Sequence, residues 1–220
     1  MPSFRRSDLQ VWKFGGASLA DAPAIDRAAG LIAAHSGPLV VVASALAGVT
    51  DLLLEGATAS AAGDRRAGAR AAAAFLLRHR QVARALVPAG PARRALLSTI
   101  DAAAREYRDL CGAVSILGHL APRASDLLAA RGERVSAAIL AAAISRQDLG
   151  GSSYQKRKRS RNHLRGEYVD ATRFIVTIDE ALIRNRNLEI PTGYSHTGDG
   201  RLVISDRLVK AQIDLADDAQ

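Results

Sequence analysis

The sequence predicts an α/β fold in which an open, mostly parallel sheet is flanked by helices. Two short apolar segments ahead of turn-forming residues have the pattern of buried strands, and the stretch between them has the periodicity of a helix. Among the 220 residues, 48% are apolar and only 4% are aromatic, so the core is expected to be rich in helices built from small aliphatic side chains.

The first predicted unit is a strand, a helix and a second strand in the arrangement of parallel sheets. The strands are expected at Leu9–Phe14 and Leu39–Ala43, each buried on both faces. Asp21 is expected to cap the intervening helix, with Pro23 at its second position. One face of that helix would then carry Ile25, Ala28, Ala29 and Ile32.

The centre of the chain predicts helices almost throughout. A helix should begin near residues 49–51 and run to about 60, and further helices are expected at 66–86, 92–112, 123–130 and 132–146, with breaks at Pro88, Pro91 and Pro122. Strands are expected again at 167–169, 175–178 and 188–192, with a helix at 179–185. Beyond Gly193 the pattern is less regular, and there is no internal repeat.

The net charge of +8 is concentrated in one segment. Six basic residues and no acid lie between Lys156 and Arg165, and without them the net charge is 8 − 6 = +2. Such a cluster could bind nucleic acid or act as an import signal. However, Tyr154 is the one neighbouring aromatic residue, and base recognition needs more than charge. We therefore favour a solvated loop and expect no nucleic acid partner.

Other features exclude several classes of protein. No run approaches the roughly 18 apolar residues that a membrane span needs, and Met1–Gln10 is not followed by the apolar core of a secretion signal. Cys111 is the single cysteine, so neither an internal disulfide nor a cysteine-cluster zinc site is expected; it is best explained as a small buried apolar residue. We expect a cytoplasmic protein that does not bind or span a membrane.

The sharpest motif is Lys13-Phe14-Gly15-Gly16-Ala17-Ser18, at the end of a strand and before a helix. Glycines there allow close approach of a ligand, and exposed amides at a helix start can bind phosphate. The Lys13 ammonium would neutralise a transferring phosphoryl group. The alternative is an exposed strand-end lysine beside an ordinary glycine turn.

Two further motifs place polar groups where a substrate could bind. Ser44 and Thr50 flank the turn after the second strand, and ligands of open α/β sheets bind at the carboxyl ends of strands. Alternatively, Ser44 is a strand-end residue and Thr50 a helix cap. An alanine-rich helix is expected to begin at Gly132, with Glu133 in its first turn. The Glu133 carboxylate could pair with a substrate ammonium group. Alternatively, the helix dipole alone would explain a carboxylate at this position.

Taken in order, these motifs resemble the amino-terminal part of the catalytic domain of the aspartate kinases, within the amino acid kinase family. The resemblance rests on 13–18, which has Ala17 where those enzymes have threonine, and on 44–51, 132–136 and 170–177. It implies a partial kinase domain over 1–220, with an incomplete carboxyl-terminal half. Its parts would be a βαβ unit at 9–64, a helical insert at 65–147, a basic loop at 150–166, and remaining strands and tail at 167–220.

The resemblance implies that the γ-phosphate of ATP, with Mg²⁺, is transferred to the side-chain carboxylate of L-aspartate, the first step towards lysine, threonine and methionine. Lys13 would be the catalytic residue. Assembly into a homo-oligomer is also compatible with the resemblance. No metal-ligating side chain is assigned. The expected nucleotide-binding residues are Lys13, Gly15, Gly16 and Ser18, and the expected aspartate-binding residues are Ser44, Thr50, Glu133 and Arg207.

The sequence departs from the family pattern near its end. Asp199-Gly200-Arg201 resembles the family's turn, and Arg207 is in register with the arginine of the glycine-rich segment that follows, but the glycines and aspartate of that segment are missing. A different class of function is therefore also open. The chain could be a catalytically inactive, kinase-like protein that binds only aspartate or a partner.

Overall fold

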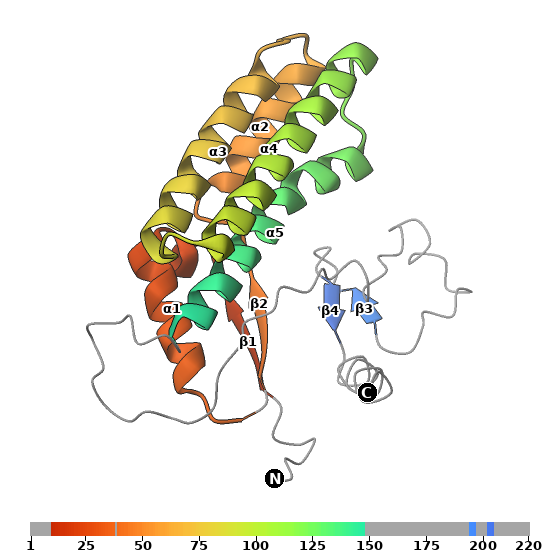
Figure 1. The fold of residues 1–220 in the computed structure, drawn as a ribbon. Coiled ribbons are helices and arrows are strands. Elements are labelled where there is room, and N and C mark those ends of the chain that lie inside the picture. Colours follow the sequence, from red (N-terminus) through yellow and green to blue (C-terminus); the bar gives the residue numbers. More distant parts are fainter. Residues whose placement is uncertain (1–9, 38, 148–193, 197–201, 205–220) are drawn as a thin grey trace, which may run out of the picture. The chain divides into compact units, whose positions relative to one another are not determined.

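The computed structural model describes residues 10–37, 39–147, 194–196 and 202–204. The chain divides into two units, 1–168 and 169–220. In the first, the elements follow one another as strand β1 (Gln10–Phe14), a short 3-10 helix (Gly16–Leu19), helix α1 (Ala22–Ala34), strand β2 (Leu39–Ala43), and helices α2 (Val49–Ala61), α3 (Ala67–Leu86), α4 (Pro91–Leu117) and α5 (Pro122–Gln147) (Figure 1).

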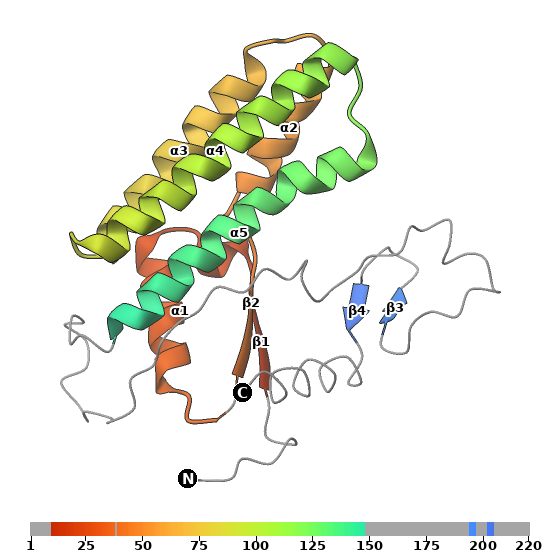
Figure 2. The same ribbon diagram turned by 45° about the vertical axis from the view of Figure 1, so that its right-hand side comes forward.

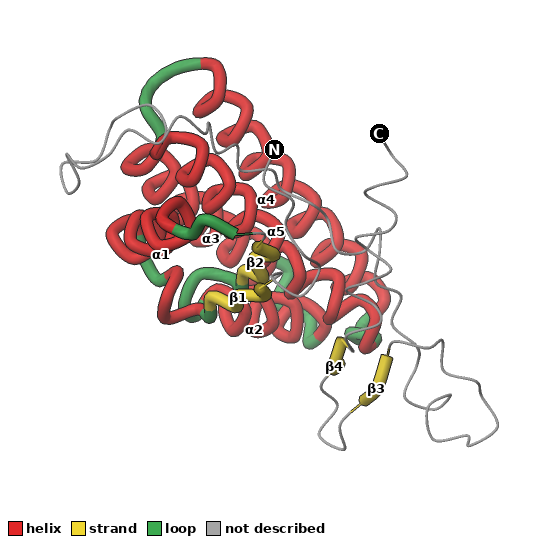
Figure 3. The backbone as a smooth tube through the Cα atoms, turned by 90° about the horizontal axis from the view of Figure 1, so that it is seen from below, coloured by secondary structure: helices red, strands yellow, loops and turns green. Residues whose placement is uncertain are grey.

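The predicted parallel βαβ unit is confirmed. β1 pairs with β2 in parallel, in a register that places Lys13 opposite Val42 and Phe14 opposite Ala43. Asp21 caps α1, since its Oδ1 accepts a hydrogen bond of 2.8 Å from the Ala24 amide. The predicted face of α1 is buried, including Ile25 and Ile32. In the view from below, β1 and β2 lie side by side next to α1 and α5 (Figure 3).

The prediction that both strands are buried on two faces is wrong for this unit. Side chains alternate along each strand, and those on one face, Val11, Val40 and Val42, are 52%, 40% and 42% exposed. Side chains on the other face pack against the core: Trp12, Leu39, Val41 and Ala43. Two paired strands with helices packed on one face leave the alternate side chains open to solvent.

Helices α2 to α5 form an elongated bundle, and α5 runs from this bundle past β2 to α1 (Figure 2). The breaks predicted at Pro91 and Pro122 are confirmed, because α4 and α5 begin at these prolines. α4 continues beyond the predicted residue 112 and ends at Gly118, whose φ of 72° is the left-handed conformation that favours glycine.

One predicted helix boundary is wrong, and its correction matters for the site. Residues 123–130 and 132–146 were expected to be separate helices, but α5 is continuous through Gly132. A Cβ on Gly132 would lie 2.9 Å from Ala45 Cβ and 3.0 Å from Val49 Cγ1. Glycine is needed here because α5 packs closely on the segment after β2, not because the helix stops.

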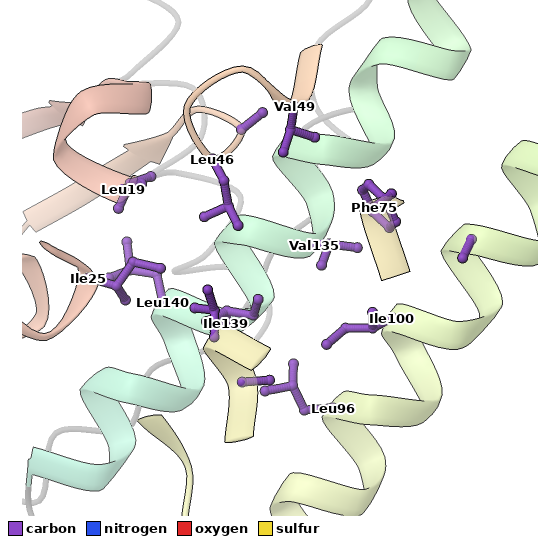
Figure 4. Close-up of a cluster of buried hydrophobic side chains, with 14 of the residues drawn as sticks. Leu19, Ile25, Leu46, Val49, Phe75, Leu96, Ile100, Val135, Ile139 and Leu140 are labelled. Carbon is purple, nitrogen blue, oxygen red and sulfur yellow. The ribbon is translucent and has the colours of Figure 1, made fainter. Parts of the chain in front are cut away.

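The core links the sheet loops to the helices. Leu46 and Val49 are fully buried and lie against α5, which carries Val135, Ile139 and Leu140 (Figure 4). Cys111 is also buried, as expected for a small apolar residue. The position of the loop after β2 is therefore set by packing on α5.

In the second unit, β3 (Tyr194–His196) pairs antiparallel with β4 (Leu202–Ile204). The sequence predicted irregular structure here, so this pairing was missed. The strands and helix predicted between 167 and 192, and the basic segment 156–165, lie outside the described residues.

Candidate functional site

The carboxyl ends of β1 and β2 lie together and form the floor of the candidate site. The last residues of the strands, Phe14 and Ala43, are paired, and the Ser44 amide donates a 3.0 Å hydrogen bond to the Phe14 carbonyl. The segments that follow, Gly15–Ser18 and Ser44–Gly48, therefore start side by side. This is the edge of a parallel sheet at which ligands are expected to bind.

Gly15 and Gly16 have different structural roles in the first of these segments. Gly15 has a φ of −75° and ψ of 172°, an extended conformation that any residue adopts, so its backbone conformation does not require glycine. A Cβ at Gly15 would meet no atom within 4 Å, whereas one at Gly16 would lie 3.3 Å from the Ala45 carbonyl oxygen. The absence of a side chain at Gly16 allows the segment after β1 to contact the segment after β2, whereas the space beside Gly15 is open.

The first turn after β1 leaves several amides unused by the helix. The 3-10 helix begins with a 2.9 Å hydrogen bond from the Ser18 amide to the Gly15 carbonyl. The amides of Gly15, Gly16 and Ala17 precede that bond and have no partner within the helix. The Ser18 side chain is exposed.

The segment after β2 makes a tight turn into α2. Gly48 is the N-cap, with φ 73° in the left-handed region, and the Val49 amide donates to the Leu46 carbonyl at 2.9 Å. No side chain caps this helix, so the alternative of Thr50 as a helix cap is wrong. Thr50 lies within the first turn of α2 and is half-buried, as is Ser44.

Glu133 reaches the same region from the middle of α5. Because α5 begins at Pro122, Glu133 is not in a first turn, and the helix dipole does not explain it. Its side chain is open to solvent, but nearby protein atoms partly desolvate the carboxylate and raise its pKa, and the charge of Lys13 acts in the opposite direction. The positive charge of Lys13 is thus the interaction in this region that favours a carboxylate at position 133.

Lys13 and Glu133 are 120 residues apart in the sequence, and the fold brings their charges within electrostatic range. Lys13 lies on β1 with an exposed side chain, two residues before Gly15. A mobile cation and a carboxylate beside the ends of two parallel strands form an arrangement that could bind a substrate carrying both signs of charge.

Sequence reasoning assigned no role to Ser136, which the structure places in the same region. Its side chain is fully buried, and its hydroxyl donates a 2.5 Å hydrogen bond to the Ser44 carbonyl. The signal that could have found it is its position three residues after Glu133, on the same side of α5. This contact joins α5 to the segment after β2.

The remaining expectations lie partly beyond the described residues. Arg207 is outside them, so its predicted role in substrate binding remains a prediction. Within the described ranges, no cluster of three or more histidine, cysteine, aspartate or glutamate side chains could hold a metal ion. Among the helices described, none has the length and apolar character needed to cross a membrane.

Comparison with known proteins identifies relatives of this arrangement. The family model described as the amino acid kinase family matches residues 8–206. A structure of E. coli aspartokinase III in complex with lysine and aspartate is 26% identical, with a TM-score of 0.53, covering 63% of this chain and 29% of that one. A second, with aspartate and ADP, is 25% identical, with a TM-score of 0.54, covering 64% and 29%. No curated protein sequence matches.

Proposed function

The chain belongs to the amino acid kinase family, and we propose that it transfers the γ-phosphate of ATP to the side-chain carboxylate of L-aspartate, forming 4-phospho-L-aspartate and ADP. The chain spans 29% of the length of each of the two E. coli aspartokinase structures, so the activity of the whole enzyme is a proposal for this chain. Those structures contain aspartate, and one also contains ADP, which supports the choice of substrates. Use in the synthesis of lysine, threonine and methionine, in the cytoplasm, is part of the same proposal.

The observation that carries the proposal is that Lys13, at the end of β1, and Glu133, on α5, lie within electrostatic range of each other. An amino acid substrate has an ammonium group that Glu133 can bind, and ATP brings phosphates that Lys13 can neutralise. Ser44 directly follows β2 and Thr50 lies in the first turn of α2, and their hydroxyls can hold the substrate carboxylates.

The reaction brings together two anions, the substrate carboxylate and the ATP phosphates, and this explains the presence of the Lys13 ammonium. The substrate carboxylate oxygen forms a bond to the γ-phosphorus as the bond to the leaving ADP oxygen breaks, and negative charge must be neutralised during the transfer. Lys13 is suited to this because it is exposed near the strand end and its charge is carried on a long, flexible side chain. Mg²⁺ enters with ATP as part of the nucleotide substrate and supplies further neutralisation of the phosphates.

The phosphate loop is expected to be Gly15, Gly16 and Ser18. Open space at the Gly15 Cβ position is a place where a phosphate could approach the backbone, and the neighbouring amides can donate to its oxygens. Gly16 would act indirectly, by keeping this turn against Ala45.

Substitution of Lys13 tests the proposal. In a hydroxamate assay with ATP, Mg²⁺, hydroxylamine and L-aspartate, we expect Lys13→Ala to reduce kcat by about 10²- to 10³-fold, the scale of losing one charge-stabilising donor. Arg65→Ala, which removes an exposed cation beyond the far end of α2, should keep wild-type activity.

Absence of hydroxamate formation by the folded wild-type chain would contradict the proposal. Calorimetric titration would then test the alternative of a catalytically inactive protein, which should bind aspartate but should not bind ATP. Competition by glutamate or acetylglutamate would show whether the acceptor is a different amino acid of the same class.

A further inference from the structure

Ser44 is held at both of its backbone polar groups by different elements. Its amide donates to the Phe14 carbonyl of β1 at 3.0 Å, and its carbonyl accepts from the buried Ser136 hydroxyl of α5. The following residues, Ala45 and Leu46, are buried. Little freedom is left for the Ser44 backbone, so the direction of its side chain depends on these two hydrogen bonds.

The same loop is packed from two sides. Gly16 approaches it on one side, where a Cβ would lie 3.3 Å from the Ala45 carbonyl oxygen and 3.4 Å from Ala47 Cα. Gly132 approaches on the other, where a Cβ would lie 2.9 Å from Ala45 Cβ. Loop 44–48 is thus enclosed between the turn after β1 and one face of α5.

The Ser136 hydroxyl does not need Ser44 in order to be satisfied. The Glu133 carbonyl in its own helix lies 3.0 Å from Ser136 Oγ, and serine side chains in helices commonly donate in this way. Ser136 Oγ is also within hydrogen-bonding distance of the Ser44 carbonyl. Of these two contacts, only the one with Ser44 joins α5 to the loop after β2.

We propose that Ser136 is a positioning residue: its hydrogen bond to the Ser44 carbonyl holds loop 44–48 in the conformation that presents Ser44 and Thr50 to the amino acid substrate. This rests on the proposed function for the identity of the substrate. Ser136 is buried and touches no substrate; it acts through the loop. It also keeps that loop in register with Glu133, one turn earlier on α5.

The test compares Ser136→Ala with Ser145→Ala. Ser145 is also on α5, and its hydroxyl donates to the Ala141 carbonyl at 3.1 Å within the helix. For Ser136→Ala we expect KM for aspartate to rise about five- to tenfold, the scale of one hydrogen bond, with a much smaller change in KM for ATP. Ser145→Ala should leave both constants unchanged.

Hydrogen exchange of the backbone amides of residues 45–50 gives a readout that needs no activity. Faster exchange there in Ser136→Ala, but not in Ser145→Ala, is expected. A general loss of packing would instead raise both KM values or speed exchange throughout the helices. Equal effects on aspartate and ATP, or unchanged exchange in the loop, would overturn the positioning role. Lack of turnover by the unaltered chain would overturn the proposed function, and the exchange comparison would still decide whether Ser136 holds the loop.

Discussion

The helical bundle and the loops at the ends of β1 and β2 are both packed around glycines, but the contacts differ in kind. In the bundle, a Cβ on Gly56 would lie 2.5 Å from Tyr107 Oη, and one on Gly68 would lie 2.3 Å from Cys111 Cβ. In the loops, a Cβ on Gly16 would lie 3.3 Å from a backbone oxygen. Glycines of the bundle make room for side chains between helices, whereas Gly16 brings two backbone segments together.

The two regions also differ in what they expose. The bundle encloses three polar groups, since Ser60, His79 and Tyr107 are buried and hydrogen-bonded to backbone atoms. Beside the loops, Lys13 at the end of β1 and Glu133 on α5 have side chains open to solvent. Substitutions in α3 and α4 should therefore change stability and leave substrate constants alone, while those at Lys13 on β1 or Ser136 on α5 should change activity.

The largest effect expected in the bundle is a dependence of stability on pH through His79. Its ring is buried, Nδ1 lies 2.7 Å from the Phe75 carbonyl and Nε2 has no partner. Burial lowers its pKa from 6.5 to about 4. Between these values the unfolded chain binds the proton and the folded chain does not, so the free energy of unfolding falls with pH from about 6.5 to about 4, by about 3 kcal/mol in total.

Urea unfolding at several pH values measures this effect against His79→Phe, which keeps an aromatic ring beside Phe75 without a titratable group. Carboxylates contribute to both curves and cancel in the difference. The difference in the free energy of unfolding between the two proteins should therefore change across this pH range through His79 alone. A constant difference would contradict the prediction.

The next effect is overpacking at Gly68. Gly68→Ala places a methyl group against Cys111 Cβ and should lower the free energy of unfolding by about 1–3 kcal/mol. Gly112→Ala is the matched control, because Gly112 is in the interior of α4 with no atom within 4 Å of its Cβ position. That variant should gain up to about 1 kcal/mol from helix propensity. Thermal unfolding compares them, and equal melting temperatures would contradict the role assigned to Gly68.

The smallest effect is expected from Tyr107→Phe. The Tyr107 hydroxyl donates a 2.7 Å hydrogen bond to the Leu53 carbonyl, linking α4 to α2. Its removal should cost about 1 kcal/mol of stability, with the KM for aspartate unchanged. A marked rise in that KM would show that bundle and site are coupled through α2, whose first turn carries Thr50.

Local sequence patterns predicted most of the first unit. Asp21 with Pro23 signalled the start of α1, prolines marked the starts of α4 and α5, and β-branched residues marked β2. These signals work because capping, missing amides and side-chain branching act within a few residues. The short strands β3 and β4 carried no comparable signal, because three-residue strands depend on their pairing.

The candidate site shows where such patterns stop. Lys13, Ser44, Thr50 and Glu133 could be selected from their motifs and order in the chain, because each motif has a recognisable local chemistry. Gly132, however, was interpreted as a helix boundary, and Ser136 received no role. Both are explained by contacts with a loop about 90 residues earlier, at Ala45 and Ser44.

The amino acid sequence by itself determined the order of strands and helices and the types of residue available for chemistry, since these follow from short-range preferences. Only the tertiary structure decided that α5 continues past Gly132 and packs on the segment after β2, bringing Glu133 towards Lys13. That outcome depends on close packing and electrostatics between segments far apart in the chain, and these act only once the chain has folded.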